Sequence, residues 1–463
     1  MLFGTMRINS SNHLEIGGRD VSELIKDHGS PLYVYDETHI EDMIDVFQNN
    51  FKSELFLARV AYASKAFLTK AMVELLTKKG MSLDCVSGGE MYTASMAGFN
   101  MSRTIIHGNN KSKEELEMCF DLNTGYIVID NIYELEQVIE IGNRRKQKMK
   151  TLVRVNPGIE AHTHEYIITA KLTSKFGESI FDKDILGKIV ELYKGNEYIS
   201  LSGFHCHIGS QVFKTNPFVE TIEVMTNFIK EIEDTYNIKT PTLNIGGGFG
   251  VYYVDGDQPV VVSNLLKELI TKAEEVIKTK GITLKELIIE PGRSIVSNAG
   301  TTLYEIGHKK ETYGGKNYVF VNGGMTDNIR PALYQAEYSA DVATNMNGKK
   351  TGDWTVAGKL CESGDLLIRS TSLQDFQSGD ILAIYTTGAY NYSMASNYNR
   401  ILKPAVVFVK NGQSRVVVKR DQFSEKSRME KWKQIAKGAC EQCGENWIPE
   451  IASPTGIKEW SKS

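Results

Sequence analysis

Eight short apolar segments, each ending in polar or glycine residues, constrain the fold of this chain more than any other feature. They span residues 56–65, 82–87, 104–109, 126–131, 152–158, 202–209, 243–250 and 287–293, so their starts are 22 to 50 residues apart. These intervals leave room for a helix, and residues 68–80 and 113–122 carry apolar residues at helical spacing. Strands that alternate with helices in this way predict βα units and a parallel sheet.

The number of units decides between two parallel architectures. Eight consecutive units over about 250 residues predict a (β/α)8 TIM-like barrel, and an open doubly wound sheet is the alternative. The barrel is favoured because unusual polar residues follow many different segments, whereas an open sheet gathers them mainly at its switch point. We therefore expect an α/β barrel.

The chain changes character after about residue 296, where strand-like segments follow one another more closely. Here Asn411-Gly412 lies between two β-branched runs, which is typical of a hairpin with a type I′ turn. A mostly β C-terminal domain is therefore expected. The predicted division is residues 1–35, with strands that join the β domain, 36–295 for the barrel, 296–420 for the β domain, and 421–463 for a polar, helical tail.

Composition excludes several classes of function. The 463 residues include 53 Lys and Arg against 57 Asp and Glu, so no basic excess indicates nucleic-acid binding. Six cysteines are too few for a disulfide framework and suit a reducing compartment. The N-terminus has no apolar stretch typical of a signal peptide, and no run approaches the roughly 18 apolar residues of a membrane helix. We expect a soluble cytoplasmic protein with no nucleic-acid or membrane partner.

Residues with useful chemistry follow the predicted barrel strands. Lys65 ends the first segment, and a lysine amine of lowered pKa can form a Schiff base. Gly246–Gly250 leave backbone N–H groups open to an anion, while Glu290 and Arg293 follow the eighth segment. Taken singly, these features can also be interpreted as a solvated lysine, a tight turn and a structural ion pair. The carboxyl ends of barrel strands form one mouth, however, so together they predict a site.

His205 and His207 are two residues apart on one predicted strand, so both are expected to face the same side. A metal pair, a ring packed on an aromatic ligand and two core histidines all remain open. No third or fourth ligand is apparent, and we predict no metal. An imine-forming lysine, an anion cradle and a carboxylate are the parts that a pyridoxal phosphate (PLP) site requires.

Seven motifs in the same order resemble the fold-type III, alanine-racemase-like PLP decarboxylases. They lie between about residues 12 and 420 and read AYASKA, HCHIGSQ, GGGFG, EPGRS, IRPALY, CESGD and GAYNYSMAS. The resemblance is closest to the members that convert meso-2,6-diaminopimelate to L-lysine and CO2, the last step of lysine biosynthesis. It implies PLP as the cofactor and an amino acid as the substrate.

The resemblance also implies roles for individual residues. Lys65 is expected to bind PLP covalently, and Cys361 to donate a proton. The expected cofactor contacts are Lys65, Asp84, Arg154, His207, Ser210, Gly247, Gly248, Glu290, Gly292, Arg293 and Tyr390. The expected substrate contacts are Arg293, Arg330, Tyr334, Glu362 and Tyr390. In the family, the residues that match Cys361 and Glu362 come from the partner subunit, so a homodimer with shared active sites is implied.

The implied pocket suits diaminopimelate, because arginines bind its distal carboxylate and a glutamate binds its distal ammonium. Pro331 suits a first helical turn, which would place Arg330 and Tyr334 about one turn apart. Three alternatives remain: a decarboxylase for arginine, ornithine or carboxynorspermidine, a non-catalytic PLP carrier, and a PLP-free barrel hydrolase that uses Glu290.

The C-terminal tail departs from the family pattern. Residues 427–451 are similar to a short stretch of a 16S rRNA uridine methyltransferase family, but this stretch is too small for a working domain. Cys440 and Cys443 supply two thiols, whereas a structural zinc site needs four ligands. The favoured interpretation is two thiols on a helix, and the tail has no assigned role.

Overall fold

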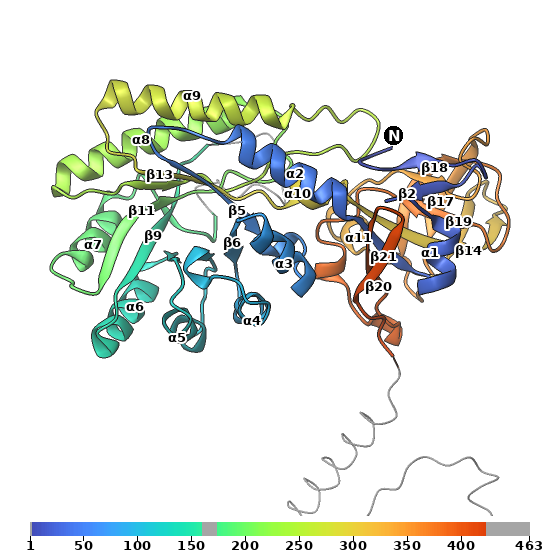
Figure 1. Cartoon of the computed structure of the whole chain (residues 1–463), viewed down its shortest axis with the longest axis horizontal. Coiled ribbons are helices and arrows are strands. Elements are labelled where there is room, and N and C mark those ends of the chain that lie inside the picture. Colours follow the sequence, from blue (N-terminus) through green and yellow to red (C-terminus); the bar gives the residue numbers. More distant parts are fainter. Residues whose placement is uncertain (1, 160–173, 423–463) are drawn as a thin grey trace, which may run out of the picture. The chain divides into compact units, whose positions relative to one another are not determined.

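A closed barrel of eight parallel strands spans residues 57–289 (Figure 1). The structure, a computed structural model, describes residues 2–159 and 174–422. The barrel strands are β5 (Leu57–Ala63), β6 (Ser82–Cys85), β7 (Thr104–Ile106), β8 (Tyr126–Ile129), β9 (Met149–Asn156), β11 (Ile199–His205), β12 (Thr242–Asn244) and β13 (Glu286–Ile289). Because β13 pairs with β5 and β8 pairs with β9, the sheet closes. The predicted barrel is confirmed, and the open sheet is wrong.

Helices surround the barrel (Figure 1). They are α2 (Glu37–Asn50), α3 (Lys70–Lys78), α4 (Gly88–Met96), α5 (Lys113–Asp121), α6 (Ile132–Arg145), α7 (Lys183–Tyr193), α8 (Asn216–Tyr236) and α9 (Val262–Lys280). Local sequence fixes their ends: Thr69 caps α3, and Ser112 with Glu115 forms a capping box at α5. The helices predicted over residues 68–80 and 113–122 are therefore confirmed.

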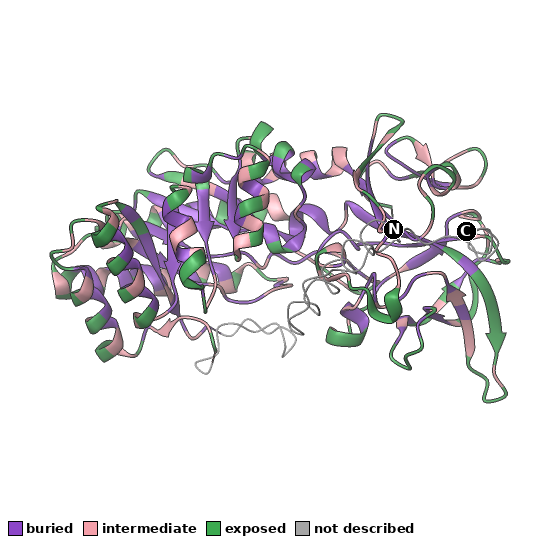
Figure 2. Ribbon diagram, turned by 90° about the horizontal axis from the view of Figure 1, so that it is seen from below, coloured by how far each residue is buried: buried purple, intermediate pink, exposed green. Residues whose placement is uncertain are grey.

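The barrel interior is a packed core. Side chains from five strands meet inside it, namely Ala61, Ile105, Tyr126, Val128, Leu152 and Ile288. A larger apolar cluster lies between the strands and the inner faces of the helices, whose outer faces are exposed (Figure 2). Polar side chains gather beyond this core, where the strands end.

A second, mostly antiparallel sheet follows the barrel. Its strands are β14 (Gly300–Glu311), β15 (Asn317–Val321), β16 (Ala340–Val342), β17 (Thr351–Ala357), β18 (Leu366–Leu373), β19 (Ile381–Ile384), β20 (Ala405–Lys410) and β21 (Gln413–Val418). The hairpin β20–β21 turns at Asn411 and Gly412, whose φ angles are 51° and 76°. Two positive φ angles are those of a type I′ turn, so the hairpin prediction is confirmed.

The N-terminal segment contributes to the β region. The strand β4 (Leu32–Asp36) pairs antiparallel with β14 and parallel with β20. Three shorter strands, β1 (Arg7–Ile8), β2 (Leu14–Ile16) and β3 (Arg19–Asp20), form a small sheet, and α1 (Val21–His28) follows. Leu14 and Ile16 pack with Val407 of β20 in one apolar cluster.

Among residues 2–159 and 174–422, no helix has the length and apolar character needed to cross a membrane. The Cys440–Cys443 pair and the predicted helical tail lie outside the described residues.

Candidate active site

A cavity of about 490 Å³ lies where the barrel strands end. Among its lining residues are Lys65, Asp84, Arg154, His207, Ser210, Gly247, Gly248, Glu290, Gly292, Arg293, Arg330, Tyr334 and Tyr390. The structure therefore gathers the predicted site residues in one place, except Cys361 and Glu362. These two are exposed on the loop between β17 and β18 and do not line the cavity.

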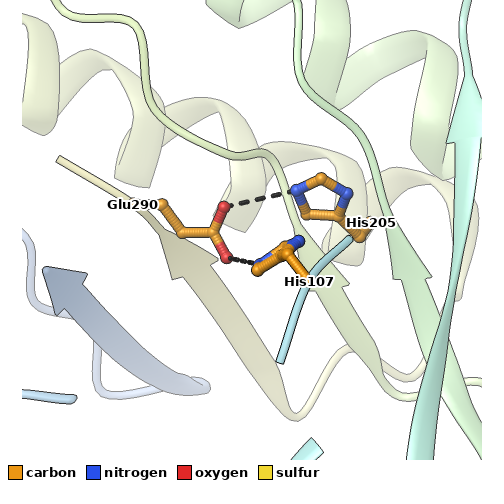
Figure 3. Close-up of side chains that lie close together, drawn as sticks. All are labelled: His107, His205 and Glu290. Atoms are coloured by element: carbon orange, nitrogen blue, oxygen red, sulfur yellow. Dashed lines mark hydrogen bonds and ion pairs between the residues drawn. The ribbon is translucent and has the colours of Figure 1, made fainter. Parts of the chain in front are cut away.

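Glu290, directly after β13, is buried and receives contacts from three other barrel strands. Its Oε1 atom lies 2.7 Å from His107 Nε2 and accepts a hydrogen bond from Asn244 Nδ2 at 2.6 Å. Its Oε2 atom lies 3.3 Å from His205 Nε2 (Figure 3). Burial alone would raise the pKa of Glu290, but the two histidines outweigh it and hold that pKa well below its usual value. Glu290 is therefore a carboxylate.

His205 and His207 do not lie on one strand, contrary to the prediction from sequence. His205 ends β11, and His207 lies beyond the strand, so strand geometry does not set its side. Burial lowers the pKa of His205 to about 3, which keeps the ring neutral. Ligand atoms of His107, His205 and Glu290 lie within 4.8 Å of one another, a spacing that also suits a metal. His107 was not among the site residues predicted from sequence.

The glycine loop after β12 can only be built from glycine. A Cβ atom on Gly247 would lie 2.0 Å from the Glu290 carbonyl oxygen. Gly248 has a φ of 107°, and a Cβ atom there would lie 2.2 Å from the Gly209 carbonyl oxygen. The Gly247 N–H donates to His207 Nδ1 at 3.3 Å. The loop therefore brings backbone close to the cavity wall, as an anion cradle requires.

Asp84 and Lys65 complete this part of the wall. Asp84, near the end of β6, is buried, and its Oδ1 atom has no hydrogen-bond partner among the described residues. Burial raises the pKa of Asp84 to about 6, although His107 opposes the shift. Lys65, after β5, lines the same cavity.

These residues fit PLP. The glycine cradle suits the phosphate, the ionised Glu290 suits a protonated ring nitrogen, and Lys65 supplies the amine for an imine. Asp84 Oδ1, which accepts no hydrogen bond from the described residues and lies 3.7 Å from His107 Nε2, leaves an acceptor open in the same cavity.

Two buried arginines line the cavity without an acidic partner. Arg293 is 7% exposed and Arg330 is 5% exposed, and neither forms an ion pair with any carboxylate of the described residues. Arg330 begins α11 (Arg330–Tyr334) with Pro331 in its first turn, so the predicted turn is confirmed. Buried charges are costly when unpaired, so these arginines favour the binding of an anion in the cavity.

The prediction from sequence omitted three residues that contact the site: His107, Asn244 and Tyr253. His107 and Asn244 lie in predicted strand segments. A polar residue in such a segment was the feature that could have indicated a role in the site. The Tyr253 hydroxyl accepts hydrogen bonds from Arg293 Nη1 at 2.5 Å and from Arg330 Nη1 at 3.2 Å.

Comparison with known proteins agrees with this site. Residues 39–297 match the pyridoxal binding domain of pyridoxal-dependent decarboxylases. The barrel and its mouth are thus those of a pyridoxal-dependent decarboxylase.

Relatives narrow this class. The chain is 46% identical to the diaminopimelate decarboxylases of Bacillus methanolicus and of Bacillus subtilis (strain 168), over 92% of this chain and 98% and 96% of theirs. It superimposes on diaminopimelate decarboxylase from M. jannaschii in co-complex with L-lysine with a TM-score of 0.85 and 32% identity, covering 91% of this chain and 96% of that one. The chain belongs to the diaminopimelate decarboxylase family.

A second match concerns the C-terminus. Residues 406–463 match an RNA methyltransferase domain. Where the structure describes this region, it shows most of the β20–β21 hairpin, which is part of the second sheet. Residues 423–463 lie outside the described part of the chain.

Proposed function

We propose that this protein decarboxylates meso-2,6-diaminopimelate to L-lysine and CO2 with PLP as its cofactor, the last step of lysine biosynthesis. The observation that carries the proposal is the pair of buried arginines, Arg293 and Arg330, in the same cavity as the PLP residues. Diaminopimelate has a distal carboxylate to occupy them, and ornithine has none. No observation favours arginine, ornithine or carboxynorspermidine as the substrate.

The residues proposed to contact PLP have different roles. PLP, when bound, supplies the electron sink that lets the bond between Cα and its carboxylate break. Lys65 would hold the cofactor through its Nζ atom. Glu290, as a carboxylate, would accept a hydrogen bond from a protonated ring nitrogen. His207 would contact the ring, while Ser210 and the glycine loop would hold the phosphate.

The substrate residues lie around the arginines. Arg330 and Tyr334 of α11, with Arg293, bind the distal carboxylate of the substrate. The Arg293 guanidinium carbon lies 4.8 Å from the centre of the Tyr390 ring, and this contact supports a role for Tyr390 beside the substrate residues.

A homodimer is part of the proposal. Cys361 and Glu362 do not line the cavity of their own chain. Hydrogen bonds nevertheless hold the loop that carries them. Buried Asp365 accepts hydrogen bonds from the backbone N–H groups of Met325 and Leu360. We place Cys361 in the partner's site as the proton donor to Cα, and Glu362 there as the partner of the distal ammonium.

The predicted domain limits and the cytoplasmic location also belong to this proposal. The location rests on the sparse cysteines, since the described ones, Cys85, Cys119, Cys206 and Cys361, form no disulfide.

The test combines a spectrum with a turnover assay. The purified protein is expected to show the visible absorbance band of lysine-bound PLP and to form lysine from meso-diaminopimelate, but no product from L-ornithine or L-arginine. A band without lysine formation would contradict the substrate. No band after addition of PLP would contradict the cofactor.

A further inference from the structure

Tyr253 does not line the cavity, and it packs in one apolar cluster with residues of the second sheet. It follows the glycine loop and is 6% exposed. Its backbone N–H donates to Asp257 Oδ2 at 2.8 Å, and its ring packs edge-on against Tyr338 with centroids 5.4 Å apart. Backbone and ring are thus both held, so the position of the hydroxyl is well defined.

The Tyr253 hydroxyl joins two arginines from different parts of the chain. Arg293 begins α10 (Arg293–Val296), directly after the last barrel strand, and Arg330 begins α11 within the β region. Both donate to the same phenol oxygen, which also lies 3.3 Å from Ser297 Oγ. Two like charges repel each other, and an acceptor that both arginines share offsets part of this repulsion. Each arginine also has an acceptor of its own, Ser210 Oγ for Arg293 and the Tyr338 hydroxyl for Arg330.

A phenol suits this position better than a carboxylate. A carboxylate between the arginines would form ion pairs with both and would compete with an anionic ligand. A neutral phenol accepts hydrogen bonds and leaves both positive charges available. Burial alone would raise the pKa of Tyr253, but Arg293 and Arg330 outweigh it and lower that pKa to about 8, so the phenol remains mostly protonated at neutral pH.

We propose that Tyr253 is a positioning residue that holds Arg293 and Arg330 together as one receptor for the substrate carboxylate remote from the reacting carbon. This inference rests on the proposed function, because it assigns that carboxylate to the two arginines. Tyr338 contacts only one of the two arginines. Its hydroxyl accepts a hydrogen bond from Arg330 Nη1 at 2.7 Å and has no hydrogen bond with Arg293.

The main test compares Tyr253→Phe with Tyr304→Phe in the full-length holoenzyme. Tyr304 is fully buried too, but its hydroxyl is hydrogen-bonded to neither arginine. Loss of a hydrogen bond to charged groups predicts that Tyr253→Phe raises KM for diaminopimelate about tenfold, with kcat within about threefold of wild type. Tyr304→Phe should leave KM unchanged, and Tyr338→Phe should raise it less than Tyr253→Phe does.

A second readout needs no turnover. Pimelate is a seven-carbon diacid without amines, so it occupies the arginines without reacting. Calorimetric titration of the holoenzyme should show about tenfold weaker pimelate binding in Tyr253→Phe than in Tyr304→Phe. The PLP absorbance band should be the same in both variants.

Wild-type protein provides a third readout if Tyr253→Phe does not fold. At a pH near 8.5, pimelate should lower tyrosinate absorbance, because an anion on the arginines raises the pKa of Tyr253. Unchanged tyrosinate absorbance, unchanged pimelate affinity, or a fall in kcat at constant KM would each overturn the proposal. Absence of lysine formation by wild type would instead contradict the proposed function, and the pimelate titrations would still test Tyr253.

Discussion

At the scale of residues, the cavity is unusual for the amount of charge that it buries. Asp84, Glu290, Arg293 and Arg330 are each at most 7% exposed. Ionised groups are normally paired when buried, and here both carboxylates have histidine contacts: His107 and His205 contact Glu290, and His107 Nε2 lies 3.7 Å from Asp84 Oδ1. The two arginines have no carboxylate partner among the described residues, and they are the groups that the proposed substrate would contact, so the free-energy cost of burying them is offset when the substrate binds.

Burial of Asp84 makes the stability of the cofactor-free protein depend on pH. Its folded-state pKa, about 6, lies above the usual 3.8 because of burial. Its contribution to stability is therefore fully present below about pH 4 and is lost as the pH rises through 6. Asp84→Asn should raise the free energy of unfolding relative to wild type by up to about 3 kcal/mol at pH 8, and by nothing near pH 4.

Urea unfolding at both pH values measures this difference. The exposed Asp375 provides the control, because Asp375→Asn should change stability little at either pH. A difference between Asp84→Asn and wild type that does not vary with pH would contradict the assignment.

Lys65 is expected to carry the covalent link to the cofactor. Lys65→Ala should lower kcat at least about a hundredfold, because the variant lacks the amine that orients PLP. Borohydride reduction followed by peptide mass analysis should find PLP on the Lys65 peptide of wild type and on no peptide of the variant. Lys70→Ala is the matched control, since Lys70 is an exposed lysine at the start of α3. Full activity in Lys65→Ala would rule out this role.

At the scale of elements, the strand ends position the site. All eight barrel strands were predictable from sequence, because apolar runs and helical spacing are local signals. The contacts of Glu290 were not predictable from sequence, because His107 and Asn244 lie 183 and 46 residues from Glu290 along the chain. Only closure of the barrel brings these three side chains together. The same holds for Tyr253, whose arginine partners belong to separate elements.

The glycine loop after β12 yields a prediction with an unusually close control. Gly248 and Gly256 have φ angles of 107° and 105°, but a Cβ atom at Gly256 would meet nothing within 4 Å. Both alanine variants therefore bear a similar backbone strain, on the order of 1 kcal/mol. Only Gly248→Ala also displaces the Gly209 carbonyl.

We expect Gly248→Ala to weaken PLP binding at least about tenfold, and Gly256→Ala to leave it nearly unchanged. Absorbance titration of the cofactor-free proteins with PLP measures both affinities. Equal affinities in the two variants would show that the loop does not form the phosphate cradle.

At the scale of the whole molecule, the cavity contains every proposed catalytic group except the two on the Cys361 loop. A second copy of the chain is needed to supply them if the proposal is correct. Lys65→Ala and Cys361→Ala subunits should each be nearly inactive alone. Mixed after dissociation, they should regain about one quarter of wild-type activity, because half the dimers are mixed and each has one intact site.

Mixing Lys65→Ala with a Lys65→Ala, Cys361→Ala double variant provides the control. Neither partner then supplies Lys65, so no activity should return. Failure of the first mixture to regain activity, with subunit exchange demonstrated, would contradict shared sites.

The strand β4 has a consequence for how the chain is made. Val34 pairs with Thr301 on one side and with Val407 on the other. A ribosome releases residues 32–36 early, whereas their partner in β20 is among the last described residues to appear. Throughout synthesis, β4 thus lacks one neighbour and presents an open edge of the kind that recruits other chains. Nascent chains that end between β13 and β20 therefore contain all eight barrel strands but keep this open edge, which favours binding by chaperones.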